Sequence, residues 1–92
     1  MDVATANRLS AIDAEMRQLQ QAIQNSRRTL NFFLRNIRAV DSAAADERIR
    51  TSEANIRNLE QRLEVLREEQ LGLIAEAVSR LSHSVTGKTR TN

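Results

Sequence analysis

Apolar residues recur at alternating spacings of three and four along the first half of the chain. The positions of this ladder are Leu9, Ile12, Met16, Leu19, Ile23, Ser26, Leu30, Phe33, Ile37 and Val40, and all but Ser26 are apolar. A period of 3.5 residues keeps one stripe of a helix turned toward a partner helix, as at the a and d positions of a coiled coil. The first half is therefore predicted to be a long helix that needs a partner surface.

The second half carries a ladder of the same kind, and we call the two ladders together the seam. Its members are Ile49, Ser52, Ile56, Leu59, Leu63, Leu66, Gln70, Leu73 and Ala77. Nine steps of about 100° separate Val40 from Ile49, so the ladders are about half a turn out of phase. A chain that folds back between them can pack them together. One continuous rod remains open as the alternative, because no Gly or Pro marks a turn.

We predict an all-α protein, an antiparallel coiled-coil helical hairpin over residues 1–85. Its expected parts are a first helix at about 4–40, a turn at about 41–46 and a second helix at about 43–84, followed by a polar, flexible tail at 86–92. The turn contains three residues that suit a helix N-cap: Asp41, Ser42 and Asp46.

One alignment of the two helices places a sizeable apolar side chain in every layer, the one in which the numbers of facing seam residues sum to 82. In it Met16 faces Leu66, and the small Ser26 faces the large Ile56. Large-against-small layers favour dense packing. The same alignment predicts ion pairs along the edges, namely Asp13 with Arg67, Arg27 with Glu53 and Arg8 with Glu76, and it places Glu15 near Glu69.

Apolar residues also lie off the seam, and two helices alone enclose only a thin core. Large exposed apolar patches normally mark an interface. We therefore expect a homodimer that forms a four-helix bundle, or docking onto another helical protein. The residues expected at this interface are Phe32, Leu34, Leu71, Ile74, Val78 and Leu81, and Val65 also lies off the seam.

The composition argues against catalysis. Cys, Trp and Tyr are absent, and no second histidine or cysteine completes a metal site around His83. The carboxylates of Glu60, Glu64, Glu68 and Glu69 alternate with arginines, as on a solvated helix face. We expect no enzyme, no cofactor and no small-molecule substrate.

No stretch approaches the ~18 apolar residues of a transmembrane helix. The residues that begin the chain also lack the basic and apolar regions of a secretion signal. We therefore expect a cytoplasmic protein with no membrane partner.

Arginine is concentrated near the predicted turn. Arg27, Arg28, Arg35 and Arg38 lie in a segment that contains no acidic residue, and we call them the arginine cluster. Such a cluster can follow the phosphates of a nucleic acid. Acidic residues at the start of the second helix can neutralise it instead, so nucleic-acid binding is kept as an alternative.

These features favour a binding role. We expect a non-catalytic protein-interaction module, a small coiled-coil assembly, adaptor or chaperone-like protein whose partner is itself, another helical protein, or both. No motif in the chain selects one of these settings.

Overall fold

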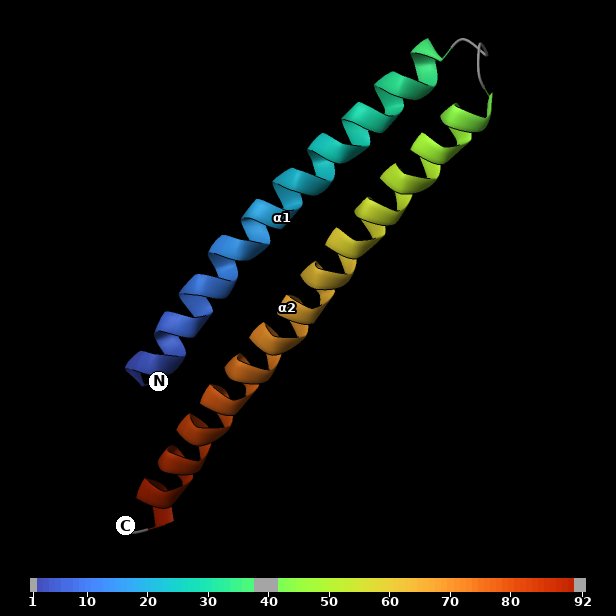
Figure 1. The fold of residues 1–92 in the computed structure, drawn as a ribbon. Helices are drawn as coiled ribbons and strands as arrows, with labels where there is room; N and C mark the ends of the chain where they lie inside the picture. Colours follow the sequence, from blue (N-terminus) through green and yellow to red (C-terminus); the bar gives the residue numbers. More distant parts are fainter. Residues whose placement is uncertain (1, 38–41, 91–92) are drawn as a thin grey trace.

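The computed structural model shows two long helices packed side by side as a hairpin (Figure 1). It describes residues 2–37 and 42–90, with side chains described as far as Ser82. Helix α1 spans Val3–Asn36, helix α2 spans Ser42–Arg90, and the molecule measures 79 × 18 × 16 Å. The prediction of an all-α helical hairpin is confirmed, and the alternative of one continuous rod is wrong.

Side chains bond to the backbone at both ends of α1. Asp2 is the N-cap, and its Oδ1 accepts a hydrogen bond of 2.7 Å from the backbone N–H of Thr5, which has no partner within the helix. At the other end, the side-chain amide of Asn36 donates to the carbonyl of Phe32 at 2.8 Å. Such a bond competes with the backbone ladder. Ile37 then adopts an extended conformation, with φ −69° and ψ 124°, and ends the helix.

The helix ends differ from their expected positions. Helix α1 ends at Asn36 rather than near residue 40, and Val40 lies outside the described residues. Helix α2 continues to Arg90 rather than ending near residue 84, so it includes residues 86–90 of the expected tail; residues 91–92 lie outside the described part. The sequence contains no Pro, and a Gly inside a helix costs only about 1 kcal/mol, so α2 can continue through Gly87.

The buried core lies in the middle of the hairpin and belongs entirely to the seam. Its members in the described part of the chain are Ile12, Ile23, Ile56, Leu63 and Leu66, each at most 8 % exposed. The other described seam residues are half-buried, except Ile37, which is exposed because it follows the end of α1. The apolar period therefore identifies which side of each helix faces the other.

Ion pairs between the helices support the predicted alignment. They join Arg80 to Asp2 (3.8 Å), Arg8 to Glu69 (2.5 Å), Arg62 to Glu15 (3.0 Å) and Arg27 to Glu60 (3.1 Å). The residue numbers of the first pair sum to 82. The residue numbers of Arg8–Glu69 and of Arg62–Glu15 each sum to five less than 82, and those of Arg27–Glu60 sum to five more. The two pairs with the lower sum lie on one edge of the seam and the pair with the higher sum lies on the opposite edge, so sums on both sides of 82 are expected. If one helix were shifted along the other by one heptad, only the ion pairs on one of the two edges could form.

The individual partners differ from the predicted ones. The pairs Arg8–Glu76, Arg27–Glu53 and Asp13–Arg67 are wrong: Arg8 contacts Glu69, Arg27 contacts Glu60, and Asp13 pairs within α1 with Arg17 at 2.5 Å. Glu15, expected beside Glu69, is paired with Arg62 instead. Each charged residue at the edge of the seam has two possible partners on the facing helix, which are one heptad apart and lie on either side of it. A long, flexible arginine side chain can reach either of them.

Candidate protein-interaction surface

Four apolar side chains of α2 form an exposed stripe near the open end of the hairpin, where α1 begins. They are Leu71 (65 % exposed), Ile74 (42 %), Val78 (55 %) and Leu81 (67 %), and we call them the outer stripe. Successive members are three or four residues apart, so all four lie on one side of the helix. This is the arrangement that a second helix can cover.

The outer stripe is uncovered because it is out of phase with the seam. At about 100° per residue, its centre lies about a quarter of a turn from Gln70, Leu73 and Ala77, the last seam residues of α2. Helix α1 packs on those seam residues and cannot cover both sides. In addition, α1 begins at Val3, and α2 continues beyond it for about 11 residues, or roughly 16 Å (Figure 1).

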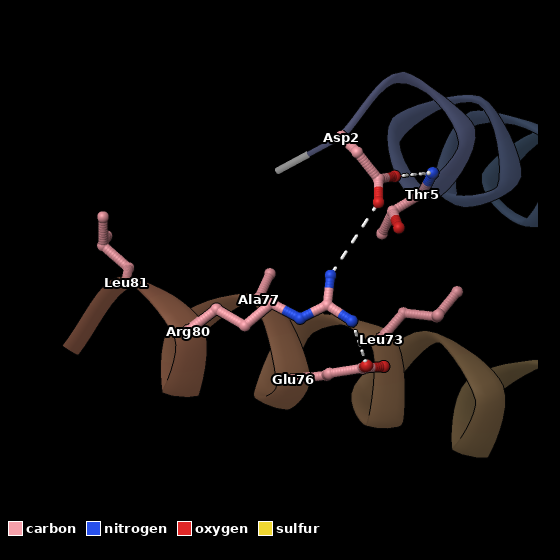
Figure 2. A pocket seen from close by; sticks show the side chains of 7 residues that line it. All are labelled: Asp2, Thr5, Leu73, Glu76, Ala77, Arg80 and Leu81. Atoms are coloured by element: carbon pink, nitrogen blue, oxygen red, sulfur yellow. Dashed lines mark hydrogen bonds and ion pairs between the residues drawn. The ribbon is translucent and has the colours of Figure 1, made fainter. Parts of the chain in front are cut away.

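An ion-pair cluster fastens the start of α1 to α2 beside the stripe. Figure 2 shows the guanidinium group of Arg80 between the carboxylates of Asp2 and Glu76. Its Nη1 lies 3.8 Å from Asp2 Oδ2, and its Nη2 donates to Glu76 Oε1 at 2.6 Å. The hydrogen bond from the backbone N–H of Thr5 lowers the pKa of Asp2, and the charge of Arg80 adds to this effect. A shallow hollow of about 320 Å³ lies between these groups.

A second ion pair holds the next turn of α1. Arg8 donates from Nε and Nη2 to the two carboxylate oxygens of Glu69, at 2.5 and 2.7 Å. These hydrogen bonds lower the pKa of Glu69 and raise the pKa of Arg8. Both side chains are partly exposed, so the pair chooses the alignment more than it stabilises the fold. Together with Arg80, it fixes which side of α2 remains uncovered.

The surface around the outer stripe carries few charges. The positions that flank it on the helix surface are Gln70, Ala75, Ala77 and Ser82. Between residues 70 and 82 the charged residues are Glu76 and Arg80, which are paired with each other. An apolar stripe with uncharged borders is typical of a helix–helix contact and unlike a solvated face.

The other predicted interface residues lie elsewhere. Phe32 (70 % exposed) and Leu34 are exposed near the turn, about 33 Å from the outer stripe along the hairpin. Val65 is also exposed, on the side of α2 away from the stripe. The structure therefore gathers four of the six predicted residues into one surface and leaves two apart. That any of them contacts a partner stays a prediction.

The arginine cluster is only partly free to bind an anion. Arg27 is engaged by Glu60, and Arg38 lies outside the described residues. Arg28 and Arg35 are exposed, two turns apart on the same side of α1, and have no ion pair within the part of the chain that the structure describes. Among the described members of the cluster, Arg28 and Arg35 are therefore the two that no acidic side chain engages.

Sequence reasoning missed one contact near the turn. The guanidinium carbon of Arg48 lies 4.6 Å from the centre of the Phe33 ring, a cation–π contact that joins the helices there. Arg48 immediately precedes Ile49, the seam residue that faces Phe33 in the predicted alignment. This placement is the only sign of the contact in the sequence.

A second hollow lies between the helices nearer the turn. Where the seam residues are serines, a hollow of about 240 Å³ opens between Ser26, Ser52 and polar neighbours. Among the described residues, no three His, Cys, Asp or Glu side chains are grouped so that they could hold a metal ion. No helix in the described ranges has both the length and the apolar character needed to cross a membrane.

Comparison with protein-family models, with curated proteins and with solved structures returned no match.

Proposed function

We propose that this chain is a non-catalytic protein-interaction module, a small assembly or adaptor protein that binds helical partners or itself through the outer stripe of α2. In this proposal the seam holds the hairpin together, and the outer stripe supplies the binding energy. Pairing of two hairpins would give a helical bundle with a second layer of core.

The single observation that supports this function best is the exposure of four large apolar side chains in one helical row. Each of them is between 42 and 67 % exposed, although α1 packs on the neighbouring side of α2, where Arg80 and Arg8 pair across the helices. Burying such side chains is worth about 25 cal/mol per Å² of apolar surface. A partner helix would gain this free energy without displacing α1.

The test is to replace Ile74 and Val78 with Asp in one variant and to identify what the chain binds, itself included. We expect the Ile74→Asp/Val78→Asp variant to lose the association, because two charges would have to be buried without partners. Affinity purification with mass spectrometry identifies candidates, and sedimentation of the purified chain with each candidate measures binding. Circular dichroism should show unchanged helix content, since both side chains lie outside the seam.

The matched control is Val65→Asp, which places the same charge at a comparably exposed apolar position on the other side of α2. It should retain every association of the unchanged chain. The proposal is wrong if the Ile74→Asp/Val78→Asp variant binds as well as the control does, with itself or with any other protein.

A second candidate function is nucleic-acid binding through Arg28 and Arg35, which are exposed on one side of α1 without ion pairs in the described part of the chain. If this function is correct, an Arg28→Gln/Arg35→Gln/Arg38→Gln variant should lose a gel shift that weakens steeply with salt. The control is Arg17→Gln, since Arg17 is equally exposed but pairs with Asp13. No shift at low salt would remove this candidate.

A further inference from the structure

The outer stripe matches itself when it is reversed. In an antiparallel pairing about residue 76, Leu71 lies level with Leu81 and Ile74 lies level with Val78. We propose that the partner of the outer stripe is a second copy of this chain, docked antiparallel about a two-fold axis at residue 76; this inference rests on the function proposed above. A two-fold contact uses the same patch on both copies, so the patch must match itself in this way.

The borders of the stripe permit close approach of the second copy. The flanking positions Ala75 and Ala77 lie near the two-fold axis, and neither carries charge or bulk. Glu76 points away from the stripe at about 180° and pairs with Arg80 of its own helix. No side chain between residues 70 and 82 would therefore meet a like charge across the contact.

Charge favours the antiparallel orientation over the parallel one. The exposed residues that precede the stripe on the same side of α2 are charged, among them Glu60, Glu64 and Arg67. In a parallel pair each of these would face its own equivalent, and like charges would meet along the whole contact. In the antiparallel pair none of these residues is level with its own equivalent, because only positions next to residue 76 are.

The direction of the stripe leaves room for the second copy. The stripe is about a quarter of a turn from the seam. Viewed down the axis of α2, the direction to the partner's α2 is therefore about 90° from the direction to α1. The two α1 helices begin near the two-fold axis, since Val3 is about level with residue 79 in the alignment given above. The dimer is therefore four helices thick only where the two open ends overlap, and the two turns point in opposite directions.

This arrangement has a length that can be measured. From the two-fold axis to each turn is about 35 residues of helix, so the dimer should be roughly 105–110 Å long. Two hairpins packed side by side in parallel would keep the 79 Å length of one hairpin. The first test is the unchanged full chain in solution, with sedimentation equilibrium for its mass and small-angle X-ray scattering for its longest dimension. We expect a dimer of about 105–110 Å; a monomer at high micromolar concentration, or a dimer near 80 Å, overturns the inference.

A cross-linking test reports the orientation directly. The chain has no cysteine, so Leu71→Cys and Leu81→Cys each introduce a single thiol. In the antiparallel dimer equal positions lie about 15 Å apart along the axis, whereas positions 71 and 81 of different copies are level. A short bismaleimide should therefore cross-link a mixture of the two variants and neither variant alone. Cross-linking of each variant alone, without a gain on mixing, indicates a parallel pair and overturns the inference.

The tests separate this inference from the proposed function. A monomer whose Ile74→Asp/Val78→Asp variant loses a different protein partner overturns the second copy as partner but leaves the interaction module in place. A dimer that the same variant fails to dissociate overturns both.

Discussion

Two regions of α2 have nearly the same apolar content but different surroundings. In the middle of the hairpin, Leu63 and Leu66 are 7 % and 0 % exposed, on the side of α2 that faces α1. Only a few residues later, Leu71 and Ile74 are 65 % and 42 % exposed. The same helix thus carries one apolar surface that is used within the chain and another that is not.

The cause of this difference is phase and not hydrophobicity. The seam residues Leu66, Gln70 and Leu73 continue toward α1, while Leu71 and Ile74 lie about a quarter of a turn away. Covering the second surface requires a second neighbour for α2. A two-helix protein can thus fix its own alignment with one apolar stripe and carry a second apolar stripe that its other helix does not cover.

The largest expected effect comes from truncating a buried leucine in the middle of the hairpin. Leu66→Ala should lower the free energy of unfolding by about 2–5 kcal/mol, because it leaves a cavity among the seam residues. Leu71→Ala should change it by less than about 0.5 kcal/mol, because that side chain is exposed. Urea unfolding followed by circular dichroism measures both.

Both substitutions are best compared in the Ile74→Asp/Val78→Asp background, which removes any contribution from association through the outer stripe. Equal losses for Leu66→Ala and Leu71→Ala would contradict the distinction between a covered and an uncovered surface. Complete loss of the helical signal in Leu66→Ala alone would agree with it.

Periodicity predicted the parts of the structure that depend on helical phase. The 3–4 ladder identified the buried residues, from Ile12 to Leu66, and the phase break near Val40 predicted the hairpin. The residues left off the ladder, such as Leu71 and Leu81, are the exposed apolar residues for the same reason. Phase accumulates at a fixed angle per residue, so sequence spacing alone determines it.

Other features depend on interactions that spacing does not determine. Arg27 pairs with Glu60 and not with Glu53, and these two acids lie one heptad apart at almost the same phase. The reach of the arginine side chain decides between them. The end of α1 at Asn36, where the side-chain amide donates to the carbonyl of Phe32, is likewise not revealed by any apolar pattern, because the ladder continues to Ile37 and Val40.

A smaller effect, in the opposite direction, is expected at the stripe-bearing end of α2. Gly72 lies inside the helix, and a Cβ added there would meet nothing within 4 Å. Gly72→Ala should therefore raise the free energy of unfolding by about 0.5–1 kcal/mol, because alanine has the higher helix propensity. Gly72 lies away from both the seam and the outer stripe, so the mass measured by sedimentation should not differ from that of the unchanged chain. A loss of stability would show that this part of α2 contacts something at Gly72.

The smallest expected effect is a dependence of stability on pH that comes from two carboxylates at the open end. Hydrogen bonds from Thr5 and Arg8 lower the pKa values of Asp2 and Glu69, respectively, in the folded chain. The unfolded chain therefore binds these protons first as the pH falls, and the stabilisation that is present above about pH 4.5 is lost below it. The buried middle contains no titratable side chain and adds nothing to this dependence.

The matched variant for this last test is Asp2→Asn/Glu69→Gln. Asparagine caps a helix about as well as aspartate, so the N-cap is kept while both titrations are removed. Urea midpoints at pH 6 and pH 3 should differ less for the variant than for the unchanged chain, and amide protection should fall in acid at the start of α1 before it falls around Ile23. If the midpoints of both proteins shift equally, Asp2 and Glu69 do not contribute to the dependence of stability on pH, and the lowered pKa values given for them in the folded chain are contradicted.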